Sequence, residues 1–253
     1  MQLLIIDAMN LIRRVYAAAE ASDAAIDATC SRALSIIHSN AKRIKATHWL
    51  MVWEDHEATW RHRLWPEYKA GRVPMPEALA ESLPDIRRYL EANGVHGYNL
   101  QGWEADDIIA SVAARAAERA IGVTILSTDK GFCQLVSPAV QVLNHFDRLL
   151  WDVEQVKERW GADPHQLTDY WAICGDQTNH LPGVAGIGKK GAGEVLELCG
   201  SLDAALGWPD MLPERLRRLL LDGIQSAMQS RVLATLRTDV TVGLNLATLR
   251  ARV

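Results

Sequence analysis

The sequence predicts an α/β fold, in which a parallel-rich central sheet flanked by helices is followed by a helical C-terminal region. Short apolar runs alternate with helical patterns through the first two-thirds of the chain, and such alternation is typical of a parallel sheet covered by helices. After Trp151 the strand-like runs stop, and only helical patterns punctuated by glycine and proline follow. We therefore expect an α/β core over residues 1–160 and a helical region over residues 161–253, packed together as one body.

The expected strands are short and apolar, and they cover Leu3–Asp7, His48–Trp53, Val123–Ser127 and Val140–Leu143. Helical periodicity in the core covers Ile26–Ile44, Pro84–Asn93 (closed by Gly94) and Ala105–Ala120. The later helices are expected at Glu154–Trp160, Gln166–Gly175, Lys190–Cys199, Leu202–Leu206 and Glu214–Thr238.

Composition narrows the class of protein without fixing its partner. No apolar run approaches the roughly 20 residues that span a bilayer, and the N-terminus lacks a signal-peptide pattern. The four cysteines have no metal-site spacing, so reduced thiols in a cytoplasmic protein are expected. A net charge of −4 argues against a general polyanion binder, but the charge is unevenly spread, with a basic run between Arg61 and Arg72.

Acidic residues follow three of the predicted strands. Asp7 ends the first, Glu54 and Asp55 end the second, and Asp129 follows the third. The carboxyl ends of parallel strands meet at one edge of a sheet, where α/β proteins place their sites. Any one of these acids could simply cap a turn, but clustered carboxylates repel one another unless hard cations neutralise them. The sequence therefore predicts an oxygen-ligand site for Mg²⁺ or Mn²⁺.

A further acidic group, Glu104-Ala105-Asp106-Asp107, opens a predicted helix. Spacing of three residues places Glu104 and Asp107 on one helix face, so Asp106 is expected to point away from them unless the first turn is distorted.

The segment from Leu181 to Gly191 contains a proline–glycine turn followed by Gly186-Ile187-Gly188-Lys189-Lys190-Gly191. Glycines let a phosphate approach backbone N–H groups, and the helix N-terminus and two lysines add positive charge. This pattern predicts a helix–hairpin–helix that holds a DNA backbone without reading bases. The alternative is a helix C-cap followed by a surface loop.

Several motifs occur in an order that resembles the bacterial and phage 5′-nucleases, which include the nuclease domain of DNA polymerase I and free-standing flap endonucleases. These motifs are Ile6-Asp7-Ala8-Met9-Asn10, Tyr68-Lys69-Ala70-Gly71-Arg72, Glu104-Ala105-Asp106-Asp107, Ser127-Thr128-Asp129-Lys130, Gly175-Asp176 and Leu181-Pro182-Gly183-Val184. The resemblance covers nearly the whole chain. It extends to the small exonuclease IX-type (Xni) branch through Arg13-Arg14, Trp60-Arg61-His62 and Asp169-Tyr170-Trp171.

The resemblance implies a PIN-like nuclease core with an arch near residues 57–90 and roles for particular residues. Lys69 would contact the scissile phosphate, with Arg72 and Asp106 also catalytic and Arg61 on the DNA. Metal ligands would be Asp7, Glu54, Glu104, Asp106, Asp107, Asp129 and Asp176. The family also binds K⁺ through hairpin carbonyls, which would here belong to Ile173, Cys174, Pro182, Val184 and Ile187.

The second metal site departs from the family pattern. Gly131 and Asn179 stand where family members commonly carry aspartate, so two carboxylates are missing, and Glu54 replaces a usual aspartate. The strength of the second site is therefore in doubt.

We expect a monomeric, Mg²⁺-dependent nuclease that cuts 5′ flaps at single-strand/duplex junctions of DNA, with replication or repair proteins as candidate partners. One alternative is a branched-DNA-binding protein with little nuclease activity. A second is a ribonuclease with the same acidic sheet edge, against which the hairpin argues.

Overall fold

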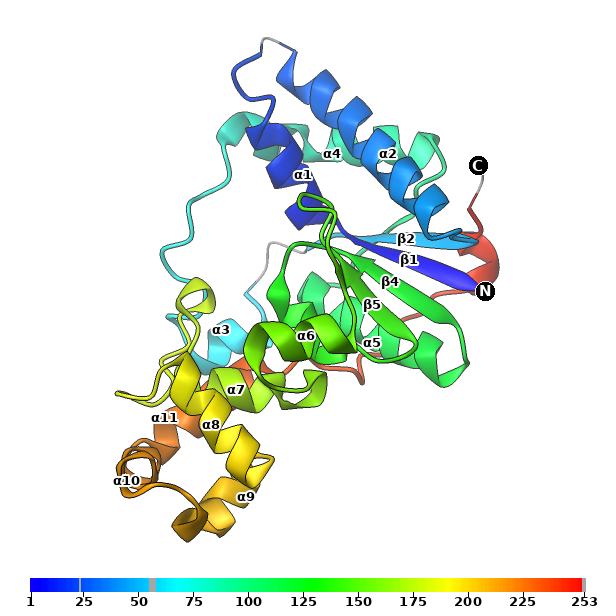
Figure 1. Ribbon diagram of the computed structural model, residues 1–253. Helices are drawn as coiled ribbons and strands as arrows, with labels where there is room; N and C mark the ends of the chain where they lie inside the picture. The colour runs from blue at the N-terminus through cyan, green and yellow to red at the C-terminus, as the bar shows by residue number, and fades with distance from the viewer. Residues whose placement is uncertain (23, 55–57, 252–253) are drawn as a thin grey trace.

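The computed structural model describes residues 1–22, 24–54 and 58–251, and it has the predicted α/β architecture (Figure 1). The central sheet has the strand order β3-β2-β1-β4-β5-β6. Every neighbouring pair is parallel except β5 with β6. The strands are β1 (Gln2–Asp7), β2 (His48–Val52), β3 (Gly97–Tyr98), β4 (Gly122–Leu126), β5 (Val140–Leu143) and β6 (Leu150–Trp151).

The strands are apolar on both sides because helices cover both faces of the sheet. One face packs against α1 (Ala8–Ala17), α2 (Ala25–Arg43) and α4 (Glu77–Ala92). The other face packs against α5 (Ala105–Glu118) and the helical region. The remaining helices are α3 (Trp60–Leu64), α6 (Val153–Trp160), α7 (Leu167–Cys174), α8 (Lys189–Cys199), α9 (Leu202–Gly207), α10 (Glu214–Asp222) and α11 (Ile224–Ala234). None of the helices in the described ranges is long and apolar enough to span a bilayer.

The predicted strands are all confirmed, while β3 and β6 have two residues each and are too short to show periodicity. Helix α1, which the sequence analysis did not identify, begins directly after β1 because the Asp7 side chain accepts a hydrogen bond from the Asn10 N–H. Helix α4 begins at Glu77 rather than Pro84. Its buried residues Leu79, Leu83, Ile86 and Leu90 recur at helical spacing, and Pro84 is tolerated inside it.

The single helix predicted over Glu214–Thr238 is wrong, because the chain breaks at Gly223 between α10 and α11. A side chain at Gly223 would come 2.8 Å from Cγ1 of Val184. Glycine there lets the turn before α8 lie against the α10–α11 junction.

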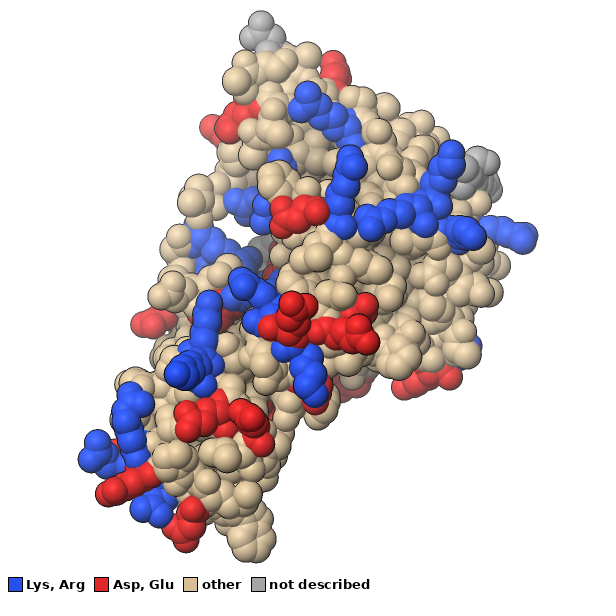
Figure 2. Space-filling view, viewed as in Figure 1, with Lys and Arg blue, Asp and Glu red and all other residues tan. Residues whose placement is uncertain are grey.

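Charged side chains are unevenly distributed over the molecule. Figure 2 shows lysine and arginine gathered over α2 and along the edge of the helical region, with acidic groups between the two areas.

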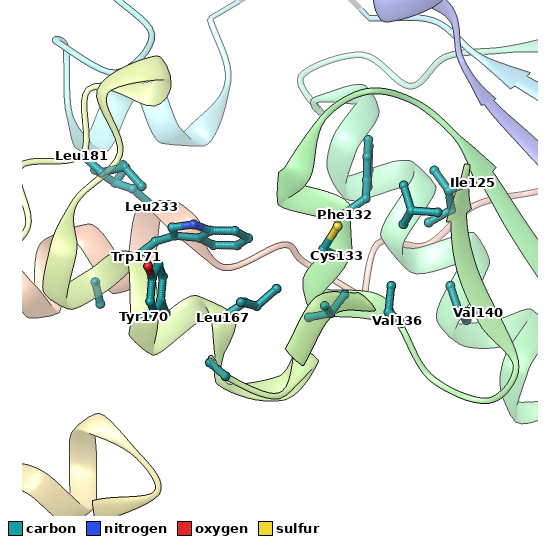
Figure 3. Close-up of a cluster of buried hydrophobic side chains, with 14 of the residues drawn as sticks. Ile125, Phe132, Cys133, Val136, Val140, Leu167, Tyr170, Trp171, Leu181 and Leu233 are labelled. Atoms are coloured by element: carbon teal, nitrogen blue, oxygen red, sulfur yellow. The ribbon is translucent and has the colours of Figure 1, made fainter. Parts of the chain in front are cut away.

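The helical region shares one hydrophobic cluster with the nuclease core. Trp171 of α7 and Leu233 of α11 lie on one side, and Phe132 and Cys133 of the short 3₁₀ helix after β4 lie on the other (Figure 3). All four side chains are buried. Burial of this kind is worth about 25 cal/mol per Å² of apolar surface, so the cluster fixes the helical region on the sheet.

Candidate active site

Four acidic side chains from separate elements line one cleft of about 530 Å³ at the carboxyl edge of the sheet. Asp7 ends β1, Glu54 follows β2, Asp129 follows β4, and Asp106 comes from the first turn of α5. Lys69 and Arg72 line the same cleft. The predicted Asp55 and the start of the predicted arch at residue 57 lie outside the described residues.

These carboxylates lack sufficient neutralising charge. Burial and the nearby Asp106 charge raise the pKa of Asp7 to about 8, although it accepts a 2.8 Å hydrogen bond from the Ser127 hydroxyl. Burial likewise raises the pKa of Glu54, and burial with the Asp106 charge raises the pKa of Asp129. A bound cation would relieve both the burial cost and the repulsion.

The donor set fits a hard divalent cation. Among the described residues, no three acidic, histidine or cysteine side chains meet closely enough to hold an ion as they stand. Mg²⁺ keeps several of its waters and needs only one or two direct carboxylates, so an open, oxygen-lined cleft suits it.

Lys69 joins the arch segment to this acidic cleft. Its Nζ lies 2.9 Å from Oε2 of Glu104 and 3.3 Å from Oδ2 of Asp106. Burial alone would lower the pKa of Lys69, but the surrounding acids, Asp106 first, raise it well above its usual value. The Lys69 backbone has φ +56, a left-handed conformation that is unusual for a residue with a side chain.

Glu104 is fully buried and held in a fixed orientation. Its Oε1 accepts a 2.7 Å hydrogen bond from the Thr59 hydroxyl, and its Oε2 accepts one of 3.3 Å from the Tyr68 hydroxyl. Burial would raise the pKa of Glu104, but the charges of Lys69 and Arg61 outweigh it and lower the pKa to about 2. Glu104 is therefore ionised across the physiological range.

Arg61 and Asp107 bind each other in this structure. Both Asp107 oxygens bind the Arg61 guanidinium, at 2.9 and 2.8 Å, and the Arg61 side chain is only 1% exposed. Asp107 also accepts hydrogen bonds from the Trp60 indole and the Arg237 N–H, so its lone pairs are occupied away from the cleft. Arg61 is too deeply buried to contact DNA in this structure.

Glu104 and Asp107 lie on a shared side of the α5 N-terminus, where both contact the Arg61 guanidinium, at 3.3 and 2.8 Å. Glu104 is the N-cap of α5 and has extended backbone angles (φ −72, ψ 145), so it does not follow the helical period. Glu104 also shares Lys69 with Asp106, which faces the cleft.

The depleted second site is filled by cationic and amide groups. Oδ1 of the buried Asp176 accepts a 2.9 Å hydrogen bond from Lys130 Nζ, and its Oδ2 accepts one from the Asn179 amide. The Asn179 carbonyl oxygen in turn accepts a 2.7 Å hydrogen bond from Arg72. Gly131 N–H donates to Asp129. Asp176 therefore lies beside the cleft, already neutralised by Lys130.

The hairpin brings two segments together at backbone level. Gly183 has φ +62, and a Cβ there would collide with the backbone N of Gly175. Among the predicted K⁺ ligands, the Ile173 carbonyl accepts a hydrogen bond from Val184 N–H at 2.8 Å. The Val184 carbonyl accepts one from Ile187 N–H at 3.0 Å. Each carbonyl retains a second lone pair, and the carbonyls of Cys174 and Pro182 belong to the same two segments.

The predicted DNA-contacting run lies at the surface where α8 begins. Gly186, Gly188, Lys189 and Lys190 are exposed, whereas Ile187 is buried and Gly191 is half-buried. Gly188 is the N-cap, and within the described residues no side chain caps it. The first N–H groups of α8 and the two ammonium groups are therefore available to an anion.

Two supporting residues were not identified from sequence. Thr59 orients Glu104, and Asn10 ties α1 to the loop after β4 through hydrogen bonds to Thr128. Thr59 also caps α3, so a capping pattern before α3 was the available signal.

Comparison with known proteins identifies the family. The N-terminal resolvase-like domain of 5′-3′ exonucleases matches residues 2–161, and their C-terminal SAM fold matches residues 162–253. The chain belongs to the 5′-3′ exonuclease family. It is similar to the flap endonuclease Xni of Pectobacterium carotovorum subsp. carotovorum, with 42% identity over 98% of this chain and 94% of that protein. The flap endonuclease Xni of Serratia proteamaculans is 40% identical over 98% and 97% of the two chains.

The fold of this 5′-3′ exonuclease family member is also found in solved structures. The 5′-exonuclease of bacteriophage T5 with bound zinc superposes with a TM-score of 0.79, at 22% identity over 92% of this chain and 89% of that one. The T5 flap endonuclease in complex with DNA and metal ions superposes with a TM-score of 0.77, over 92% of this chain and 89% of that one, also at 22% identity. These comparisons establish the fold that carries the acidic cleft.

Proposed function

We infer that this protein is a flap endonuclease and 5′-3′ exonuclease that hydrolyses phosphodiester bonds in branched or 5′-flapped DNA with a divalent metal ion. The observation that carries this proposal is the cleft that Asp7, Glu54, Asp106 and Asp129 line beside Lys69. Family membership and the similarity to Xni flap endonucleases support it.

The acids would hold Mg²⁺, or Mn²⁺ in its place, and the ion would supply Lewis-acid activation of the phosphodiester and of a water. Asp7, Asp106 and Asp129 are the residues proposed to hold it, with Glu54 reaching the ion directly or through a water. Glu104 is proposed to contribute to the same site by holding the Lys69 ammonium beside it.

Lys69 and Arg72 are proposed to bind the scissile phosphate. In the present arrangement, Lys69 neutralises Glu104 and Asp106. With the charge of a bound divalent cation in the cleft, the Lys69 ammonium would be available to pair with a phosphate oxygen, and Arg72 would neutralise an adjacent one. Hydrolysis would break the P–O bond to the leaving strand as the water oxygen bonds to phosphorus, with one water proton passing to the leaving oxygen.

The hairpin would position the duplex part of the substrate. Lys189, Lys190 and the N–H groups at the start of α8 are proposed to bind backbone phosphates, which sets the distance to the cleft without selecting sequence. K⁺ held by the hairpin carbonyls would add to this positive surface. We further propose that the protein acts as a monomer in the cytoplasm, with division into a core over 1–160 and a helical region over 161–253.

The test is a divalent-ion titration of flap cleavage, with binding of the same DNA measured in parallel. We expect cleavage to appear as Mg²⁺ is added and to be absent with chelator, while binding persists in both conditions. Binding without cleavage at saturating Mg²⁺ and Mn²⁺ would instead identify a branched-DNA-binding protein, which the neutralised Asp176 makes the second candidate.

A further inference from the structure

A groove with arginine side chains continues from the acidic cleft across the surface of α1 and α2. Its first hollow, of about 290 Å³, lies between Arg14 of α1 and Arg32 of α2. Its second hollow, of about 450 Å³, runs along α2 to Arg43 and Arg148. Ser35, Ile36 and His145 line both hollows, and Arg14 lines the catalytic cleft as well as the first hollow. The three spaces therefore follow one another across this surface.

The α2 side of this path is a single helix face. Its lining residues, Arg32, Ser35, Ile36, Ser39, Asn40 and Arg43, recur every three or four positions. With a rise of about 1.5 Å per residue, this stripe is about 16 Å long, which matches a few nucleotides of extended backbone. The opposite side is the loop between β5 and β6, which reaches up to α1 in Figure 1.

The charge of the groove is uncompensated. No aspartate or glutamate occurs among the described residues that line its two hollows, and none of Arg14, Arg32, Arg43 and Arg148 makes an ion pair within the described chain. The nearby Asp147 side chain is exposed and accepts a hydrogen bond from Asn144. The basic area over α2 in Figure 2 corresponds to this part of the molecule. Four cations this close favour a ligand that carries several negative charges.

His145 lines both hollows and carries unpaired polar atoms. Both of its ring nitrogens are buried, and neither has a hydrogen-bond partner among the described residues. Burial and the Arg14 charge lower the pKa of His145 to about 4, so the ring is neutral at pH 7 and offers one donor and one acceptor. Buried polar atoms normally have partners, and an unpaired one costs free energy.

The end of the groove nearest the cleft also carries an exposed aromatic ring. Phe146 is 72% exposed, and the Arg14 guanidinium lies 5.9 Å from its ring centroid. Aromatic rings next to a basic groove stack unpaired bases, whereas paired bases have their faces covered within the duplex.

We propose that this groove binds the backbone of a single DNA strand that extends beyond the catalytic cleft, with one base stacked on Phe146. The proposal rests on the proposed flap-cleaving function, because the strand reaches the groove through the cleft. Arg32, Arg43 and Arg148 would bind phosphates, and Ser35 and Ser39 would donate hydrogen bonds to them.

The test compares the double variant Arg43→Ala/Arg148→Ala with the matched control Arg115→Ala/Arg119→Ala, at the C-terminal end of α5 on the opposite face of the sheet. Two DNA substrates share one duplex and differ only in the flap, which has a single nucleotide or about 12 nucleotides. Binding is measured in chelator over a range of salt concentrations. Cleavage of the short-flap substrate is measured with Mg²⁺.

We expect the groove variant to bind the long flap about tenfold more weakly, with a salt slope reduced by roughly one to two units, while binding of the short flap is unchanged. Phe146→Ala should also weaken long-flap binding by about tenfold, with little change in salt slope. The control should bind both substrates like the wild type. An equal loss of affinity for both substrates in the groove variant would show that the groove binds duplex. No loss of affinity for either substrate would show that the groove binds no DNA.

These outcomes are separable from failure of the proposed function. If the wild type does not cleave the short-flap substrate, but the groove variant and Phe146→Ala lose long-flap affinity and the control does not, the nuclease assignment fails and the groove assignment stands. If all variants cleave the short flap normally and bind the long flap equally well, the groove assignment fails and the nuclease assignment stands.

Discussion

Removing one partner of the buried Arg61–Asp107 ion pair should strongly destabilise this protein, because the other charge is left buried without its partner. Each of the five Arg61 N–H groups has an acceptor. Two of them donate to the Asp107 carboxylate, and two donate to the backbone carbonyls of Leu233 and Thr235, at 3.0 and 2.8 Å. The fifth faces Oε2 of Glu104 at 3.3 Å. The guanidinium thus joins the arch segment, α5 and the end of α11.

Replacing Arg61 with methionine keeps most of the volume but leaves the fully buried Asp107 carboxylate without its countercharge. Only the Trp60 indole and the Arg237 N–H would still donate to it. Breaking a buried pair in this way costs about 3–5 kcal/mol. In a domain of this size the loss corresponds to a fall in Tm of about 10 °C.

The assay is urea unfolding followed by circular dichroism, with Arg63→Met as the control. Arg63 lies two residues away in α3 and is exposed, so its replacement should change the free energy of unfolding by less than about 0.5 kcal/mol. Arg61→Lys should be intermediate, because an ammonium cannot make the bidentate contact. Adding Asp107→Leu to Arg61→Met should restore much of the lost stability. A loss below about 1 kcal/mol in Arg61→Met would refute the reasoning.

Three further predictions concern the cleft and the hairpin. In metal-free buffer the free energy of unfolding should fall as the pH rises from about 4 to about 8. The reason is that the Asp7 pKa is raised from 3.8 to about 8 in the folded state, which therefore binds more protons than the unfolded state in this pH range. Asp7→Asn should flatten the dependence of the free energy of unfolding on pH, measured by urea unfolding. The same pH dependence in Asp7→Asn as in the wild type would contradict this. Replacing Lys189 and Lys190 with alanine should lower the slope of log affinity against log salt for duplex binding by roughly one to two units for every DNA sequence. Cleavage at saturating enzyme should change much less. An unchanged slope would show that the segment is only a helix-capping loop. Gly131→Asp with Asn179→Asp should raise the affinity for a second Mg²⁺ or Mn²⁺ in calorimetry, and the same ion count and affinity as in the wild type would count against it.

The fold was predictable because its signals are local. Strand runs such as Leu3–Asp7 are apolar on both faces, and their alternation with helices leaves few alternatives to a parallel sheet. The convergence of Asp7, Glu54 and Asp129 at one edge follows from the same topology. The break at Gly223 has a local signal, a glycine inside a helical run, whereas its close approach to Val184 comes from a distant part of the chain.

The roles of individual acids were less accessible from sequence. Helical spacing grouped Glu104 with Asp107, but Glu104 is the N-cap of α5 and its side chain also contacts Lys69, which in turn contacts Asp106 at the cleft. The partner of Asp107 is Arg61, 46 residues away in sequence. No local pattern distinguishes a buried arginine that neutralises a carboxylate from an exposed one that binds phosphate. The groove along α2 was equally hidden, because α1, α2 and the β5–β6 loop meet only in the folded chain.

The central claim, that the acidic cleft is the catalytic centre, is tested most directly by single-turnover cleavage of a 5′-flap substrate by the wild type and by Asp106→Asn. Both proteins are used at saturating Mg²⁺, and binding of the same DNA is measured in parallel. We predict that the wild type cleaves at the junction, whereas Asp106→Asn binds the flap as tightly or more tightly and does not cleave it. The variant loses an oxygen ligand together with a negative charge that repels the phosphates. Cleavage by Asp106→Asn at the wild-type rate would contradict the assignment of this cleft as the catalytic centre.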